Sequence, residues 1–530
     1  RQATRAAEKH FGPQILNMTN FTDGPLSGWE AGLIHGPDWF LFGRLRATSL
    51  LWSEDWGALG PEVSGYITNM LRAAARPRQL PIGEYIIANH NPTMPQRALS
   101  ALMHGAKTLH FYCYGPYYAF ADGMIADNPE TMRTVGNLAR FLAKADATLY
   151  PAQVPPASVA ILYGRSHEIW QQDTAVGTER RTMYLALQHA HVPVDLISED
   201  DVVEGLLQDY KVLYVTESNV RREVARKIGV WVNAGGVLQM CAGAGLRDEY
   251  DEPLAELAAL AGVKVGEVTK PGGDYREHYG LPHRAPQGKV TVNLAAAGGL
   301  LAGCSAGAPG PEFPVLGYTE EAQAAGATVI ATFADGKPAG FVRKVGRGLV
   351  LRYAFMPGLG YVKSANPKPA QVTTDYRPEQ GRLLALPVRL AHWRFDDPSW
   401  RGESGQLPLA ASGLSQPASW SGLALRVDNA SGANLKYRDV EDNGAANINC
   451  RVGTVRFWFK ANWSGGNPGG WARLIEMGSK DVPADGWWAL SVNPTASELR
   501  LESQVNGNLV AHCVATVNWD WSRWHEITVT

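Results

Sequence analysis

Short apolar runs alternate with helix-forming segments along the first 150 residues. The runs have the length of buried strands and end in polar or turn-forming residues; they cover residues 14–22, 49–56, 80–88 and 108–114. Segments that read as helices cover residues 38–47, 62–76, 95–106 and 129–149. This order predicts four βα units, and hence a parallel sheet with crossover helices.

The same alternation resumes after a proline-rich linker. Strand-like runs cover residues 158–164, 193–197, 212–216 and 237–240, and helices are expected over 179–190 and 221–233. Residues 151–265 therefore predict a second, doubly wound α/β domain of flavodoxin-like type. Residues 266–385 are β-rich, and the runs 327–333, 339–345 and 348–355 predict a β-meander that extends this domain.

The pattern changes again over residues 386–530. Eleven of the 17 Trp residues lie here, and the region holds short alternating runs such as 454–463, 486–492 and 498–504. Such runs, separated by Gly, Asn and Pro, predict an antiparallel β-sandwich or jelly roll. Most of these indoles are expected in its core, with one or two on a concave face for stacking on sugar rings.

Composition narrows the class of protein. At 530 residues the chain is too long for one core, and a net charge of −2 gives no pull toward nucleic acid or an anionic membrane. No window approaches the ~18 apolar residues of a membrane span. The high content of Gly, Pro and Trp is typical of loop-rich extracellular β domains with polar, Trp-lined clefts. This composition favours a carbohydrate partner and a secreted or periplasmic location.

Both ends of the chain suggest a fragment. It begins without Met or a signal peptide and stops inside a strand-like run, so a localisation signal would lie in sequence before residue 1. Four βα units are too few to close a (β/α)₈ barrel, so residues 1–150 form either a small open sheet or the second half of a barrel. We expect the second half, because the start of the chain independently suggests missing sequence. The strand ends would then meet on one rim, presenting Thr22/Asp23, Glu54/Asp55, Asn89/His90 and Tyr112/Tyr114.

The run SLLWSEDW carries the candidate chemistry. Glu54 and Asp55 stand between Trp52 and Trp56 at the end of an expected strand. An indole can cover the apolar face of a pyranose, while carboxylates bind its hydroxyls or act at its anomeric centre. We expect Asn89, His90, Tyr112 and Tyr114 to position the sugar. The structural alternative is that Glu54 caps the next helix and both Trp residues belong to the core.

A second candidate is the strand-to-turn segment GGVLQMCAGAG. It places Cys241 where class I glutamine amidotransferases carry their nucleophile. A working thiolate also needs a His base and a carboxylate, and His278 and His283 lack a His-x-Glu pairing. A buried, small apolar role is therefore the default for Cys241. The five Cys residues show no metal-ligand spacing, and no phosphate loop or dinucleotide fingerprint implies a cofactor.

Together these segments resemble a known family. Residues 158–265 with 327–361 resemble the amidotransferase-like trimerisation domain of a β-galactosidase family, and the four βα units look like the second half of its catalytic barrel. Residues 390–530 look like a concanavalin A-like (laminin G type) module, in HWRFDD, TVRFWFKANW and WHEITVT. The resemblance implies a homotrimer, and analogy alone would allow a Ca²⁺ in the last module.

The resemblance also implies retaining hydrolysis by two Glu residues, at the ends of the fourth and seventh barrel strands. The fourth strand is absent from this chain, and the seventh would end near residues 88–90, where no acid stands. Glu84 is nearby but inside its strand, so Glu54, with Asp55 beside it, is the first choice for a rim acid.

Three functions follow in order of preference. The first is a β-galactosidase-like glycoside hydrolase acting on oligo- or polysaccharide. The second is a non-catalytic carbohydrate-binding or assembly protein, with a degenerate barrel and recognition by the C-terminal module. The third is amide chemistry at Cys241.

Overall fold

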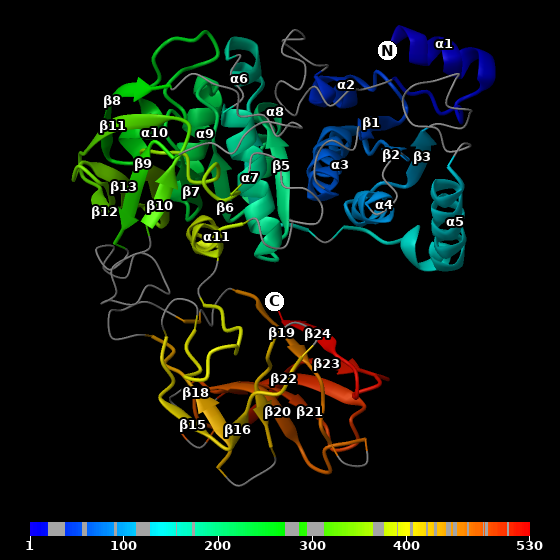
Figure 1. Ribbon diagram of the computed structural model, residues 1–530, viewed down its shortest axis with the longest axis vertical. Coiled ribbons are helices and arrows are strands. Elements are labelled where there is room, and N and C mark those ends of the chain that lie inside the picture. Colours follow the sequence, from blue (N-terminus) through cyan, green and yellow to red (C-terminus); the bar gives the residue numbers. More distant parts are fainter. Residues whose placement is uncertain are drawn as a thin grey trace. The chain divides into compact units, whose positions relative to one another are not determined.

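The computed structural model divides the chain into two compact units (Figure 1). The N-terminal unit comprises residues 1–392, with 404–406 and 440–447, and the C-terminal unit comprises 393–403, 407–439 and 448–530. The structure describes residues 1–19, 38–55, 61–88, 93–112, 128–154, 156–171, 175–270, 286–293, 312–363, 376–388, 391–402, 406–419, 422–428, 432–440, 447–448, 453–463, 466–480, 482, 486–505 and 508–529.

The N-terminal unit begins with a small parallel sheet. Its strands are β1 (Leu51–Asp55), β2 (Ile82–Ile87) and β3 (Thr108–Tyr112), hydrogen-bonded in that order. The helices of this part are α1 (Gln2–Phe11), α2 (Trp39–Leu45), α3 (Pro61–Ala75), α4 (Met94–Met103) and α5 (Pro129–Leu149). Helices α3 and α4 each connect two adjacent parallel strands, as the βα pattern of the sequence predicted.

The first expected strand is not formed as predicted. Residues 14–19 contain no strand, and residues 20–22 lie outside the described residues. The backbone carbonyl of Asn17 accepts hydrogen bonds from the N–H groups of Ser49 and Leu50, at 3.1 and 3.2 Å. Residues 14–19 are thus hydrogen-bonded to the residues just before β1, but they do not pair with β1 as a neighbouring strand.

Helix α3 has two different faces. Pro61 stands at its start, where a missing N–H costs nothing. Ile67, Met70 and Leu71 are buried in the main hydrophobic core, as their helical spacing predicts. Asn69 and Arg72 point instead to the following α/β part, described below.

A nine-stranded mixed sheet forms the rest of the N-terminal unit. Its order is β10-β9-β12-β13-β14-β7-β6-β4-β5. The parallel strands are β4 (Val159–Tyr163), β5 (Val194–Ser198), β6 (Val212–Val215), β7 (Val237–Met240) and β14 (Gly348–Tyr353). The antiparallel strands are β9 (Gly288–Val292), β10 (Glu312–Val315), β12 (Thr328–Phe333) and β13 (Pro338–Val345).

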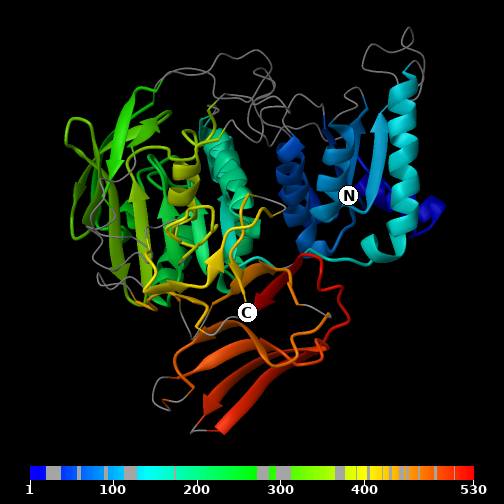
Figure 2. The same cartoon turned by 60° about the horizontal axis from the view of Figure 1, so that its bottom comes forward.

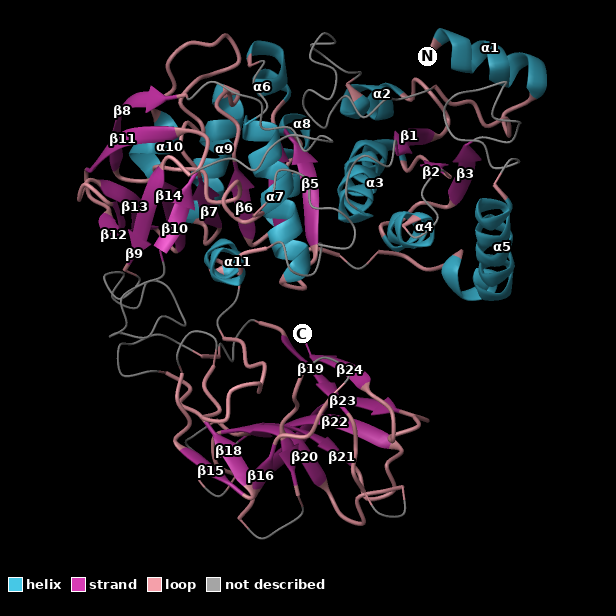
Figure 3. Ribbon diagram, in the orientation of Figure 1, coloured by secondary structure: helices cyan, strands magenta, loops and turns pink. Residues whose placement is uncertain are grey.

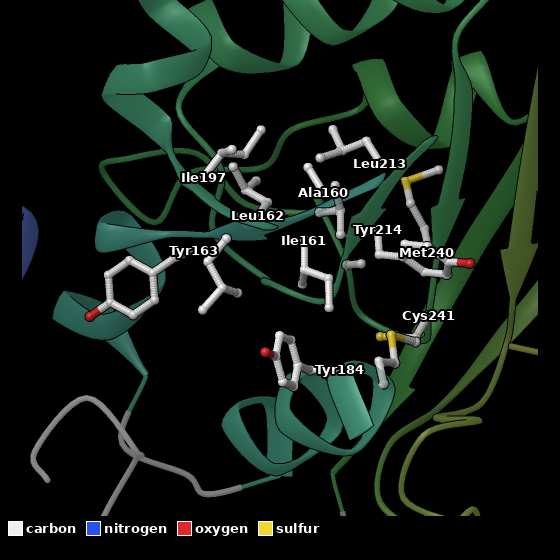
Figure 4. Close-up of a cluster of buried hydrophobic side chains, with 14 of the residues drawn as sticks. Ala160, Ile161, Leu162, Tyr163, Tyr184, Ile197, Leu213, Tyr214, Met240 and Cys241 are labelled. Carbon is white, nitrogen blue, oxygen red and sulfur yellow. The ribbon is translucent and has the colours of Figure 1, made fainter. Parts of the chain in front are cut away.

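The predicted meander is present, and β14 joins it to β7 in parallel, so residues 151–265 and 266–385 share one sheet. The helices around it are α6 (Arg165–Trp170), α7 (Ala175–His189), α8 (Glu199–Val203), α9 (Arg222–Asn233), α10 (Glu256–Leu260) and α11 (Pro378–Ala385); β8 (Val263–Thr269) pairs with β11 (Thr319–Ala324). Figure 4 shows the core side chains of β4, β6 and β7 beside Tyr184 of α7.

The C-terminal unit is antiparallel β structure (Figures 2 and 3). Its main sheet has the order β20-β21-β22-β23, with bounds Ala472–Met477, Trp488–Val492, Glu498–Val505 and Asn508–Thr516. Smaller pairs are β19 (Val455–Phe459) with β24 (His525–Val529), β15 (Ala410–Ser412) with β18 (Asn434–Lys436), and β16 (Leu414–Ser415) with β17 (Arg426–Val427).

One apolar core joins the main sheet of this unit to the β19–β24 pair. Leu490, Val492 and Leu499 meet Trp521 and Ile527 there. The expectation that most of these Trp residues serve as core holds for Trp521, which packs among aromatic neighbours from the same region. Among all described residues, no helix is both long and apolar enough to cross a bilayer.

Candidate functional site

Four aromatic side chains gather on one side of the β1-β2-β3 sheet. The ring of Trp52 lies 4.7 Å from that of Tyr85 and 5.2 Å from that of His110, and Tyr85 lies 5.0 Å from Tyr112. We call these four residues the aromatic face. They come from all three strands, so the parallel sheet itself brings them together.

The backbone register places Glu54 in the same row. Glu54 is paired with Tyr85, and Tyr85 with His110. Because successive strand residues alternate between the two sides of a sheet, positions 52 and 54 belong to the same side. The side chains of Glu54 and Asp55 lie outside the described part of the structure, as do the whole residues Trp56, Asn89, His90 and Tyr114.

Glu84 belongs to the opposite side of the sheet. Its side chain is fully buried, and the hydroxyl of Thr68 on α3 donates to its Oε2 atom at 3.4 Å. Ile86, two residues further on β2, packs with Met94 and Ala98 of α4. The structure therefore directs Glu84 toward the helices and does not bring it together with Trp52 or Tyr112.

Trp52 is more enclosed than a sugar-stacking residue would be. Only 8% of its surface is exposed, whereas Tyr85, His110 and Tyr112 are each partly exposed. Of the two described residues that were expected to contact substrate, Tyr112 is partly exposed, and Trp52 instead packs against the rings of Tyr85 and His110.

Sequence reasoning missed Tyr85 and His110. Both lie within their strands, whereas the residues predicted from the sequence lie at strand ends. The position of Tyr85 could have been predicted from the alternation of side chains along a strand. In LPIGEYIIA, Tyr85 falls on the side of the strand opposite to Ile82 and Ile86, which are core residues. An aromatic residue of opposite parity to a buried aliphatic pair points away from the helix-covered side.

Polar contacts hold α3, the helix that follows Glu54, against the large α/β part of the unit. The amide of Asn69 donates to the carbonyl oxygen of Val194 at 2.7 Å, and Arg72 donates to Asp195 at 2.5 Å. The Nε of Arg180 on α7 donates to the hydroxyl of Tyr66 at 2.9 Å. These and further hydrogen bonds with Tyr184 hold the helix to groups distant in sequence.

Arg180 is the centre of a buried charge cluster. Its side chain is inaccessible and pairs with Glu217, which is equally inaccessible, and with Glu168 at 3.0 Å. Its guanidinium lies 4.7 Å from the centroid of Tyr163. Nε, Nη1 and Nη2 of the guanidinium each donate to a group of this chain, two carboxylates and a hydroxyl, so the cluster is a structural junction between α7 and α3.

The environment of Cys241 does not suit a nucleophile. The residue is fully buried at the end of β7 (Figure 4), and burial raises the pKa of its thiol well above the usual range. The next glycine in the turn, Gly243, donates its N–H to Glu320 at 2.8 Å, and Arg352 binds both oxygens of that carboxylate at 2.7 and 2.8 Å. The turn is already occupied by an internal ion pair, which confirms a buried role for Cys241.

His278 and His283 lie outside the described residues. Within the residues that are described, no group of three or more His, Cys, Asp or Glu side chains is placed to hold a metal ion.

No protein-family model matches the sequence, and no curated protein is significantly similar to it. Solved β-galactosidases share its fold. Gan42B, a GH42 β-galactosidase from G. stearothermophilus, is 17% identical over 66% of this chain and 52% of its own, with a TM-score of 0.50. The β-galactosidase from Bacillus circulans sp. alkalophilus is 17% identical over 71% of this chain and 55% of its own, with a TM-score of 0.51.

A third structure, the cold-adapted β-galactosidase from Rahnella sp. R3, is 16% identical over 100% of this chain and 66% of its own, with a TM-score of 0.51. The chain thus spans about half to two thirds of the length of these proteins. At this identity the likeness concerns the fold, which is that of a β-galactosidase-like glycoside hydrolase.

Proposed function

We propose that the chain is part of a glycoside hydrolase that acts on β-galactosides at the aromatic face. The observation that supports the proposal is the backbone register Glu54–Tyr85–His110, which assigns position 54 to the same side of the sheet as two partly exposed rings. Glycosidases need a carboxylate close to the anomeric carbon and polar or aromatic groups around the sugar. Solved β-galactosidases with this fold supply the substrate class of the proposal.

In this proposal Glu54 is the nucleophile. Its carboxylate attacks the anomeric carbon, the bond to the aglycone oxygen breaks, and a second carboxylic acid protonates that oxygen; water then hydrolyses the glycosyl ester. Glu84 is unsuited to either role because it is buried on the helix side with Thr68. Among the described side chains, the aromatic face includes no second carboxylate, so the acid comes from elsewhere in the protein.

The phenol of Tyr85 and the imidazole of His110 are placed to bind sugar hydroxyls. Trp52 fixes both rings by edge and tilted contacts, so they are preorganised at little cost in side-chain entropy. Asn89, His90 and Tyr114 retain their expected roles around the substrate as part of the proposal.

The experiment is turnover of nitrophenyl β-galactoside by the wild type, Glu54→Gln and Glu84→Gln. We expect Glu54→Gln to lower kcat by roughly a thousandfold or more, because it removes a group that bonds to the reacting carbon. Glu84→Gln keeps an acceptor for Thr68 and serves as the matched control, with kcat little changed. Equal activity of Glu54→Gln and the wild type would remove Glu54 from the mechanism.

A second candidate is non-catalytic carbohydrate binding. It is favoured by Trp471 of the C-terminal unit, whose side chain is half exposed beside charged residues. A wild-type chain that turns over no glycoside but still binds polysaccharide would support this candidate over hydrolysis.

A further inference from the structure

The main sheet of the C-terminal unit has a polar side opposite its core. Leu490 and Val492 face the core, so Ser491 between them faces away. The register pairs Ser491 with Arg473 on β20 and with Arg500 on β22. Directly paired residues of antiparallel strands share a side, so these three residues form a row across the sheet.

One end of this row carries an accessible aromatic ring. Trp471 is 50% exposed, and the guanidinium of Arg500 lies 5.0 Å from its ring centroid. Glu498 accepts from Arg500 at 2.8 and 3.1 Å. The carboxylate orients the guanidinium, and the guanidinium supports the indole, so the exposed ring is held in place.

The other end of the row has a similar contact of carboxylate, arginine and indole, but there the indole is buried: Trp487 is 1% exposed. Arg473 donates to Glu476 at 2.7 Å, and its guanidinium lies 5.5 Å from the ring centroid of Trp487. The indole N–H of Trp487 donates to the same carboxylate at 2.6 Å. Both arginines are thus oriented by a carboxylate and an indole, while 35–43% of their side-chain surface remains exposed.

Ser491, between the two arginines, lacks a hydrogen-bond partner for its side chain in the described part of the chain. That side chain is 1% exposed. A buried hydroxyl without a partner is unfavourable, so a ligand that supplies the missing hydrogen bond would be stabilised there.

We propose that this side of the sheet binds a neutral saccharide, with Trp471 stacking on a pyranose ring. Arg473, Arg500 and Ser491 bond its hydroxyl groups. The charges support a neutral ligand: each arginine is already neutralised by a carboxylate, so the row has no net charge to attract a polyanion. An exposed indole beside fixed donors and acceptors matches the alternating apolar and hydroxyl surfaces of a sugar.

The site is separate in sequence from the aromatic face, and it requires no catalysis. It rests on the second candidate function, carbohydrate binding, whereas a failure of the proposed hydrolysis leaves it standing. The two are distinguished because the readout here is binding by the whole chain, with product formation measured in parallel.

The experiment is affinity electrophoresis of the full chain in gels that contain galactan, galactomannan or xyloglucan. We expect retardation by at least one of them, and at least a tenfold weaker affinity for Trp471→Ala. Trp458→Ala is the matched control, because Trp458 is similarly exposed (43%) but lies on β19, outside the main sheet; its retardation should equal that of the wild type.

Ser491→Ala separates binding from folding. It should weaken the affinity severalfold while leaving the melting temperature unchanged or raised, because a buried unpartnered hydroxyl is removed. Equal retardation of Trp471→Ala and the wild type, or no retardation by any of the three polysaccharides, would overturn the proposal. Retardation by polygalacturonate alone would overturn the assignment to a neutral ligand.

Discussion

The indole of Trp52 meets the ring of Tyr85 edge to face across adjacent strands, with their centroids 4.7 Å apart. Tyr85 is in turn the register partner of Glu54. The buried Trp52 therefore determines where the phenol stands in the row that contains the candidate nucleophile.

Replacing Trp52 tests this dependence. Trp52→Ala removes a buried ring and should lower stability by about 3 kcal/mol or more, because a cavity remains beneath Tyr85 and His110. Trp52→Phe keeps part of the edge contact and should raise KM for nitrophenyl β-galactoside with a smaller loss of stability. Thermal unfolding and steady-state kinetics measure both effects; an unchanged KM in Trp52→Phe would argue against the positioning role.

The buried cluster at Arg180 predicts a large structural effect. Arg180→Met leaves the inaccessible Glu217 without its cation, which costs roughly 3–5 kcal/mol. Tyr66→Phe removes a single acceptor and should cost about 1 kcal/mol. Urea unfolding followed by fluorescence gives these values. Arg165→Met is the control, because its pair with Asp38 is half exposed and should be worth less than about 1 kcal/mol; an equal loss in both arginine variants would contradict the account.

Glu179 predicts a pH dependence of stability. Burial raises the pKa of its carboxyl to about 8. Hydrogen bonds from the backbone N–H groups of Gly358 and Leu359 favour the charged form and oppose this rise. The native state therefore holds a proton that the carboxyl of the unfolded chain loses near its usual pKa of 4.5. Stability should fall as pH rises from about 4.5 to 8, by up to about 1.4 kcal/mol per pH unit, and then level off.

Glu179→Gln removes this titration. The variant should differ in free energy of unfolding from the wild type, because one backbone N–H then faces an amide NH₂. The difference should also change with pH, because only the wild type should lose stability through residue 179 as pH rises. Urea unfolding of both proteins at several pH values between about 5 and 8 gives the difference. A difference that stays constant with pH would show that Glu179 is ionised in the native state.

The two cysteines of known environment should differ in reactivity. Cys241 is buried with a raised pKa, whereas Cys513 on β23 is exposed and free. Iodoacetamide should label Cys513 in the native protein and Cys241 only after denaturation, because the thiolate is the reactive form. Peptide mass spectrometry measures both sites in one sample. Rapid native labelling of Cys241 would reopen amide chemistry at that residue.

Local patterns were sufficient to predict most elements of the N-terminal unit. Helix α5 spans Pro129–Leu149 as predicted, because its start is marked by Asn128 as N-cap and by Pro129. The strand of residues 14–22 failed because an apolar, β-rich run does not say whether a neighbouring strand will pair with it.

Properties that depend on distant residues could not be read from the sequence. Glu54 and Glu84 both stand within strands, and only the register shows that Glu54 shares a row with Tyr85 while Glu84 faces α3. Helix α7 carries Arg180, whose charge suggests a solvent face, yet its side chain is inaccessible because Glu217, 37 residues away, neutralises it. Pairings of this kind are set by the tertiary fold.

Azide rescue tests the role of Glu54 most directly. In Glu54→Gly, azide can occupy the space of the lost carboxylate and attack the anomeric carbon of dinitrophenyl β-galactoside, whose leaving group needs no protonation. We predict that azide accelerates the reaction and that the product is α-galactosyl azide, the inverted product of a single displacement. No acceleration by azide, or formation of β-galactosyl azide, would contradict the assignment of Glu54 as the nucleophile.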